Sequence, residues 1–427
     1  MIALLLFIFI IGYAAIAFED YLKINKTAVA LITGVLCWTT YMLFSANKLD
    51  VNESLLMHLG DISSILFFLL GAMTIVELVD AHDGFEIIKE LITQVNKRKL
   101  VWMIGFIGFF LSAVLDNLTT TIVMVSLLRK LIRHKEDRLL LVGIVIIAAN
   151  AGGAWSPIGD VTTTMLWIGG QITAGNIMLK LFIPSLVCLI IPLIAVSFQL
   201  KGNVERTDAE VNASSYLLPK SKQKIILLLG ILILVLVPVF KTYTHLPPFM
   251  GMLLGLGLLW LVTEFMHRSI SHDEKDHLTL VSALHKIDIA SVLFFLGILL
   301  AIAALETSGI LSAMAFWLSE TIGNLTTIVM SIGLLSAVID NVPLVAASQG
   351  MYSLGQYPVD SFLWEFLAFC AGTGGSILII GSAAGVAAMG MEKIDFFWYV
   401  KKISWLALLG YLAGSLVYVL IEYYFYL

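Results

Sequence analysis

Long apolar segments separated by short polar stretches run through the whole of this 427-residue chain. They form two series of six, at 1–18, 27–46, 60–79, 100–128, 139–168 and 176–198, and then at 223–240, 248–266, 290–306, 322–352, 362–390 and 403–425. Since about 20 apolar residues cross a bilayer as a helix, the pattern predicts an all-α polytopic membrane protein. The polar stretch 199–222 predicts a cytoplasmic linker between two halves, 1–198 and 223–427.

Short sequences recur in the two halves in the same order. LSAVLDN at 111–117 returns as LSAVIDN at 335–341, and SSILFFL at 63–69 returns as ASVLFFL at 290–296. Both LSAV copies place an aspartate and an asparagine in the middle of an apolar segment, where an ionisable side chain is costly and usually functional. The recurrence predicts a duplicated protein whose halves meet at a polar site, as in secondary transporters.

Two segments, 100–128 and 322–352, are too long for one ordinary span. Each is either one long tilted helix or a re-entrant hairpin with Asp-Asn at its tip. Because Lys and Arg concentrate in cytoplasmic loops, their positions distinguish the two. No basic residue occurs in 307–321 or 353–361, whereas the first segment is flanked on both sides, by Lys89, Lys97, Arg98 and Lys99 and by Arg129, Lys130, Arg133, Lys135 and Arg138. We therefore predict two re-entrant hairpins, one opening inward and one outward.

With both termini outside, this arrangement leaves only Lys48, Lys180 and Lys241 of the 25 basic residues in outside loops. Each half then has five transmembrane helices and one hairpin. An odd number of crossings turns the second half upside down, so the predicted fold is two inverted repeats. The expected location is a plasma membrane of the bacterial inner-membrane type, with the main basic loops in the cytoplasm.

The segments 139–168 and 362–390 combine glycine with polar residues at mid-membrane. Glycine and proline weaken a helix interior, so both segments are predicted to be broken helices. Irregular backbone at this depth is tolerated where it lines a cavity or an ion site. The residues concerned are Gly152, Gly153, Pro157 and Gly159 in the first segment and Gly372, Gly374, Gly375, Gly381 and Gly385 in the second.

Composition excludes several classes of protein. With 59% hydrophobic and 13% charged residues the chain fits neither a disordered segment nor a disulfide scaffold, and no basic face for nucleic acid is evident. The three cysteines stand singly in apolar segments, and the eight histidines avoid the span centres, so most of them are expected in solvated loops. No metalloprotease or serine-hydrolase motif occurs, so neither an enzyme nor a cofactor is predicted.

Four motifs carry a resemblance to a known family. They are DNLTT at 116–120, NAGGAWSPIGDVTTT at 150–164, DNVP at 340–343 and GTGGSILIIGSAAG at 372–385. Together they resemble the NhaD-type sodium/proton antiporters, of the ion-transporter superfamily that includes arsenite permeases and sodium–dicarboxylate symporters. The resemblance implies a scaffold and a transport domain, a homodimer and elevator-type movement. The dicarboxylate relatives have Ser-Asn-Thr at the hairpin tips; aspartate replaces that serine here and favours transport of cations alone.

The predicted ligands of Na⁺ and H⁺ come from the hairpin tips and the broken helices. A first Na⁺ site is expected at Asp116, Asn117 and Asp160, and a second at Asp340, Asn341 and Ser382. Helix capping is the structural alternative for the aspartates. Further candidate residues for cation or proton binding are Thr119, Thr120, Asn150, Thr162, Thr163, Ser336, Ser376 and Glu77.

The mechanism expected from these residues is competition for a buried carboxylate. If only the loaded or protonated carrier reorients, competition between H⁺ and Na⁺ at Asp116 and Asp160 yields exchange. Cytoplasmic Na⁺, with Li⁺ as a second cation, would leave against external H⁺. The alternatives are an arsenite-type or anion carrier of the same superfamily, then an intramembrane enzyme, then a channel.

Overall fold

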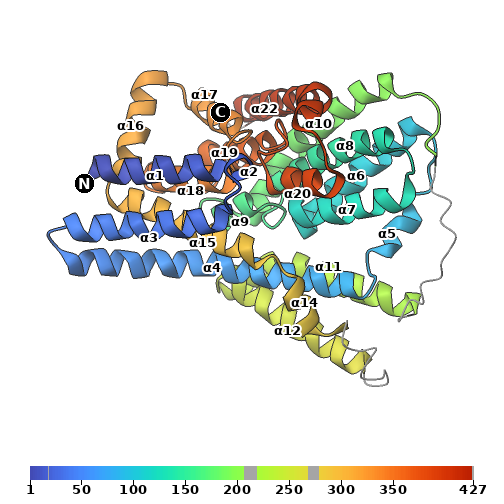
Figure 1. Cartoon of the computed structure of the whole chain (residues 1–427), viewed down its shortest axis with the longest axis horizontal. Coiled ribbons are helices and arrows are strands. Elements are labelled where there is room, and N and C mark those ends of the chain that lie inside the picture. Colours follow the sequence, from blue (N-terminus) through green and yellow to red (C-terminus); the bar gives the residue numbers. More distant parts are fainter. Residues whose placement is uncertain (18, 206–218, 268–277, 426–427) are drawn as a thin grey trace.

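The computed structural model describes residues 1–17, 19–205, 219–267 and 278–425, and nearly all of them are helical (Figure 1). Within these ranges nine helices are long and apolar enough to cross a membrane, or ten if the bent pair α16–α17 counts as one span. The prediction of an all-α polytopic membrane protein is confirmed. Of the predicted linker 199–222, residues 206–218 lie outside the described part of the chain.

Six long helices pack into one group, here termed the scaffold. Within it α3 lies against α1 and α15, and α4 lies against α11, α12 and α15 (Figure 1). Its members are α1 (Ile2–Ala17), α3 (Lys26–Phe44), α4 (Lys48–Ala81), α11 (Lys220–Thr244), α12 (Pro248–Met266) and α15 (Ile289–Thr307).

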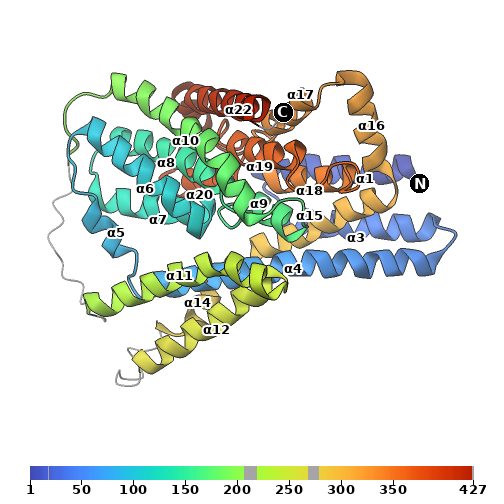
Figure 2. The same cartoon turned by 180° about the vertical axis from the view of Figure 1, so that it is seen from behind.

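The helices of the predicted hairpins and broken segments, together with α10 and α22, form a second group, termed the central bundle. Figure 2 shows α9 near the middle of the molecule, where it contacts α4 of the scaffold and α18 and α19 of the bundle. The bundle consists of α6 (Lys97–Leu115), α7 (Asn117–Leu131), α8 (Lys135–Ala154), α9 (Val161–Ile168), α10 (Ala174–Gln199), α17 (Leu325–Leu335), α18 (Asn341–Met351), α19 (Phe362–Gly374), α20 (Ala383–Glu392) and α22 (Trp405–Phe425).

Short elements connect the long helices. Glu86–Leu91 forms α5 and Leu280–Lys286 forms α14, while α16 (Ile310–Ile322) runs across the direction of its neighbours (Figure 1). The region 307–321, expected to be a loop, is therefore mostly helix. Gly323, with φ of 68°, ends this helix in a left-handed conformation. The others are α2 (Glu19–Leu22), α21 (Phe396–Tyr399) and a π-helical turn (Val400–Ser404).

α4 is longer than its apolar pattern suggested. It begins at Lys48 rather than near residue 60 and has 34 residues, so at 1.5 Å per residue it is about 50 Å long, against a hydrocarbon core of about 30 Å. Asn47 starts the helix, because its side chain accepts a hydrogen bond from Leu49 N at 3.2 Å. The polar first turns project beyond the apolar part, where nothing requires them to be hydrophobic.

The start of α6 and the end of α7 lie at the same end of the molecule. Lys97, at the start of α6, pairs with Asp137, at the start of α8, with Nζ and Oδ1 2.6 Å apart. The chain reverses at Asp116, whose φ of 84° is rare for a residue other than glycine. In the second half, α17 and α18 both pack against α16. The helix pairs α6–α7 and α17–α18 occupy the two predicted hairpin segments and are called the hairpins below.

The two broken helices are the most buried part of the bundle. Every residue from Leu141 to Ala154 of α8 and from Leu363 to Gly374 of α19 is buried. Gly152 and Gly374 allow the hairpins to approach, since a Cβ atom would lie 2.1 Å from Phe109 O in the first case and 1.9 Å from Gly333 O in the second. Close packing of the hairpins against both helices therefore leaves no room for a larger residue at these two positions.

Two histidines depart from the expectation of solvated loops. His82, just after α4, and His267, just after α12, are both buried, and their rings stack with centroids 4.9 Å apart. His82 Nδ1 lies 2.6 Å from Leu78 O, and its Nε2 lies 3.1 Å from Nε2 of His267. The pair joins the ends of two scaffold helices, which sequence position alone did not indicate.

Candidate functional site

Asp160 lies where α9 begins after an irregular stretch of backbone. α8 ends at Ala154, and Asp160 is the N-cap residue of α9 in an extended conformation. Its Oδ1 accepts hydrogen bonds from Thr162 N at 2.9 Å and from Thr162 Oγ1 at 2.8 Å. The carboxylate is 1% exposed and faces the N-terminal end of a half-helix, which favours negative charge.

Both hairpins reach this carboxylate through an asparagine. Asn117, the first residue of α7, donates from Nδ2 to Asp160 Oδ2 at 2.6 Å. Asn341, the first residue of α18, donates to Asp160 Oδ1 and Oδ2 at 3.3 and 3.4 Å. Asp160 is therefore a point at which side chains from both hairpins meet.

Asn150 extends the network to the second broken helix. It is fully buried, and its Oδ1 accepts from Asn117 Nδ2 at 2.9 Å. Its Nδ2 donates to Ser376 Oγ at 2.8 Å and to Ser382 Oγ at 3.0 Å. Ser382 caps α20 as Asp160 caps α9. The predicted ligands Asn117, Asn150, Asn341 and Ser382 thus belong to one continuous network.

Asp116 shares a small cavity with Asp160. The cavity has a volume of about 20 Å³ and is closed by apolar side chains of α4, α11 and α12, which leaves room for one water molecule or a small cation. Asp116 accepts hydrogen bonds from Thr119 N at 2.7 Å and Thr119 Oγ1 at 2.8 Å. Thr120 Oγ1 is buried without a hydrogen-bond partner among the described residues. Carboxylate, amide and hydroxyl oxygens of this kind suit a hard cation.

Asp340 does not join this network. It caps α18, with Oδ1 accepting from Val342 N at 3.2 Å. It also lines a separate cavity of about 70 Å³, together with Tyr13, Glu19 and Lys26 of the scaffold side. The structure therefore brings Asn341 and Ser382 to the network around Asp160 but places Asp340 beside the scaffold.

Three other candidates have contacts of their own. Thr163 Oγ1 donates to the backbone oxygen of Asp160 at 2.9 Å, so it supports the start of α9. Ser336 Oγ donates to Ala371 O at 2.8 Å and ties the second hairpin to α19. Glu77 pairs with Lys286 at 3.2 Å, away from the network.

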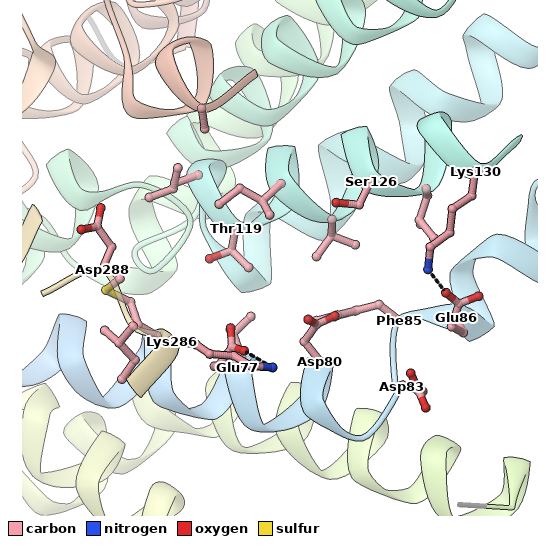
Figure 3. A pocket seen from close by; sticks show the side chains of 18 residues that line it. Glu77, Asp80, Asp83, Phe85, Glu86, Thr119, Ser126, Lys130, Lys286 and Asp288 are labelled. Atoms are coloured by element: carbon pink, nitrogen blue, oxygen red, sulfur yellow. Dashed lines mark hydrogen bonds and ion pairs between the residues drawn. The ribbon is translucent and has the colours of Figure 1, made fainter. Parts of the chain in front are cut away.

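Glu77 belongs to a larger cavity, which Figure 3 shows between α4 and α7. Its volume is about 540 Å³, and Thr119 forms part of its wall. Several acidic side chains line it, and sequence reasoning singled out Glu77 alone among them. The others stand at helix ends or in a loop, near basic residues, so their positions in the sequence did not indicate that they line one cavity. Tertiary packing brings them together.

A buried carboxylate in α19 was also missed. Glu365 is fully buried and pairs with Lys180 of α10 at 3.2 Å. Tyr418 OH donates to Glu365 Oε2 at 2.9 Å, and Asn176 donates to Oε1. Glu365 therefore fastens α19 to α10 and α22. The signal available in the sequence was an acidic residue in an apolar segment. Its partner is Lys180, which was expected in an outside loop.

Comparison with known sequences identifies the family. The profile described as citrate transporter matches residues 4–365. Sodium/proton antiporter 1 of Arabidopsis thaliana is 51% identical over 97% of this chain and 72% of its own length. The Na(+)/H(+) antiporter NhaD of Alkalimonas amylolytica is 30% identical over 96% of this chain and 88% of its own.

The chain belongs to the NhaD-type sodium/proton antiporter family. Sodium/proton antiporter 2 of Arabidopsis thaliana is 47% identical over 97% of this NhaD-type chain and 98% of its own length. The crystal structure of the YdaH transporter of Alcanivorax borkumensis has a TM-score of 0.61 over 94% of this chain and 99% of its own. At 12% identity it shows a shared fold.

Proposed function

We propose that this protein exchanges cytoplasmic Na⁺, and also Li⁺, for external H⁺ by alternating access. The names of the plant and bacterial relatives support sodium/proton exchange. The observation that carries the proposal is the contact of Asp160 with both hairpins, through Asn117 and Asn341. A single buried carboxylate held by both halves is affected by any movement of either hairpin.

The chemistry of exchange follows from burial. A bare carboxylate in a site without water is costly, so it binds either a proton or a cation. Asp116 and Asp160 border a cavity large enough for one ion, so a monovalent cation there would lie close to both carboxylates and offset one of their two negative charges. Protons then compete with Na⁺ for the same oxygens. A carrier that reorients only when loaded or protonated couples the two flows.

Inverted repeats would supply the inward- and outward-facing states. Matching contacts support them: Ser112 Oγ donates to Ala149 O at 2.6 Å in the first half, and Ser336 Oγ donates to Ala371 O at 2.8 Å in the second. We place the protein as a homodimer in a plasma membrane, with both termini outside and the basic loops cytoplasmic.

An anion carrier is the second candidate, because the matching family profile is described as citrate transporter. Binding an anion calls for cationic side chains or free N–H donors. In the described part of the chain, no ion pair connects a lysine or arginine to Asp160. The acidic network argues for a cation.

Purified protein in liposomes with a pH-sensitive dye tests the proposal. NaCl, LiCl, KCl, sodium-free citrate and arsenite are added in turn to vesicles preloaded with acid. Na⁺ and Li⁺ should release protons, and Asp160→Asn should abolish the signal. A response to citrate or arsenite without Na⁺ would overturn the cation assignment.

A further inference from the structure

The large cavity between the scaffold and α7 has an unusual set of charges. Five acidic side chains and two lysines line its 540 Å³. In Figure 3, Glu77 and Asp80 rise from α4 into the space, and Thr119 and Ser126 face them from α7. The acidic residues are Glu77, Asp80, Asp83, Glu86 and Asp288, and the lysines are Lys130 and Lys286.

This cavity adjoins the ion-sized cavity of the candidate site. Met73 lines both of them. Thr119 lines the large cavity, and its hydroxyl donates to Oδ2 of Asp116, which lines the small one. The Asp116–Thr119 pair and Met73 therefore belong to the wall between the two cavities.

Each of the two lysines forms an ion pair with one carboxylate of the large cavity. Lys286 Nζ lies 3.2 Å from Glu77 Oε1, and Lys130 pairs with Glu86 (Figure 3). Both lysine side chains are about half exposed, so the pairs are partly solvated and individually weak. Asp80 stands between the two pairs, with its carboxylate directed into the cavity.

We infer that this cavity is the port through which cytoplasmic cations reach Asp116, and that Lys130 and Lys286 set the affinity at which it loads. The inference rests on the proposed exchange of cations. The acidic side chains raise the local concentration of Na⁺, since a cleft lined by one sign of charge attracts counter-ions. Lys130 and Lys286 compete with Na⁺, because each ammonium group pairs with a carboxylate that a passing cation would otherwise bind.

Opposite charge changes in the port should have opposite effects on the apparent KM. Asp80→Asn should raise the KM for cytoplasmic Na⁺ about two- to five-fold, and Lys286→Gln should lower it by a similar factor, as expected for the change of one unit charge in a wet cavity next to the site. Lys130→Gln is a second variant with the sign of Lys286→Gln. The kcat should stay within about two-fold of wild type in all three, since none of these residues contacts the network around Asp160.

The measurement uses vesicles in which the protein has a known orientation, at low and high ionic strength. Na⁺ is presented to the face carrying the basic loops, then to the opposite face, with N-methylglucamine chloride as the added salt. The shifts should appear only from the first face and shrink at high salt, where the screening length falls to a few ångström. Glu205→Gln is the control, because Glu205 is an exposed carboxylate paired with Arg133 outside the cavity.

Shifts of the same sign for Asp80→Asn and Lys286→Gln, no shift in either, or shifts seen from the opposite face would overturn the port. An equal shift in Glu205→Gln would overturn it as well, because the effect would then be general surface charge. Failure of the proposed exchange looks different: wild-type protein would show no Na⁺-dependent proton release from either face.

Discussion

Asp160 and Ser382 hold equivalent positions in the two broken helices. Each is the extended N-cap residue of the resumed half, with φ and ψ of −146° and 147° at Asp160 and −145° and 154° at Ser382. The cap is charged in one half and neutral in the other. The same backbone geometry therefore carries the titrating chemistry on one side only, which predicts that the two hairpin aspartates are not interchangeable.

We expect Asp340→Asn to impair transport but to retain more competition between H⁺ and Na⁺ than Asp116→Asn. Asp116 borders the cavity that contains Asp160, whereas Asp340 lines a separate cavity with Lys26. The measurement is the apparent KM for Na⁺ at several pH values in proteoliposomes. Equal and complete loss in both variants, with normal folding, would contradict the asymmetry.

The positions of the polar interruptions were evident in the sequence because they violate a simple rule. Asp116 and Asp160 stand in segments that must otherwise be apolar, and glycines surround the break before Asp160. A charge buried at that depth requires a structural reason, so the residues near the breaks could be predicted from the sequence alone. Their joining into one network, with Asn341 bonded to Asp160, depends on how the halves pack.

Two features escaped prediction for different reasons. The first turns of α4 are polar, as a loop would be, and the helix forms because Asn47 caps it. The pair of Glu365 and Lys180 needs α19 and α10 to be neighbours, which residue spacing does not reveal. Tertiary contact supplies the partner of Glu365, whereas the start of α4 depends on a local cap.

Gly152→Ala and Gly374→Ala should each destabilise the protein by about 2–3 kcal/mol or more, because a new methyl group would overlap backbone oxygens of the hairpins. The Cβ atoms would lie 2.1 Å from Phe109 O and 1.9 Å from Gly333 O. The measurement is the apparent Tm in detergent. Gly60→Ala and Gly257→Ala are matched controls, since nothing lies within 4 Å of a Cβ there. Equal Tm values in all four variants would refute the close approach.

The histidine pair makes stability depend on pH. Burial lowers the pKa of His82 to about 4, and proximity of His267 adds to this, against the effect of the hydrogen bond to Leu78 O. The unfolded chain, with a pKa of about 6.5, binds the proton first as pH falls. The stabilisation is therefore present above about pH 6.5 and is lost as pH falls toward 4, by roughly 3 kcal/mol in all.

His82→Phe should flatten this part of the pH dependence while keeping a ring in the stack. The measurement is the apparent Tm between pH 4 and 7.5 in detergent, read as a slope because the substitution also changes absolute stability. His134→Gln, at a side chain that is 57% exposed, should leave the slope unchanged. A His82→Phe variant with the wild-type slope would assign the pH dependence to other groups.

Asp160→Asn is the most direct test of the coupling site. The substitution keeps the size of the side chain and one oxygen that can accept from Thr162 or Asn117, but it removes the titrating group. If H⁺ and Na⁺ compete for this carboxylate, the variant should lose Na⁺-driven proton release at every pH, a loss of about 100-fold or more in rate. Residual Na⁺ binding, followed by calorimetry, should lose most of its pH dependence, whereas wild-type affinity should fall as pH drops because protons displace the cation. Ser336→Ala, which removes a hydrogen bond to Ala371 O outside the network, controls for general loosening of the bundle. A variant that still exchanges Na⁺ for H⁺ with the wild-type pH profile would move the coupling away from Asp160, and Asp116, across the same small cavity, would then be the group to replace.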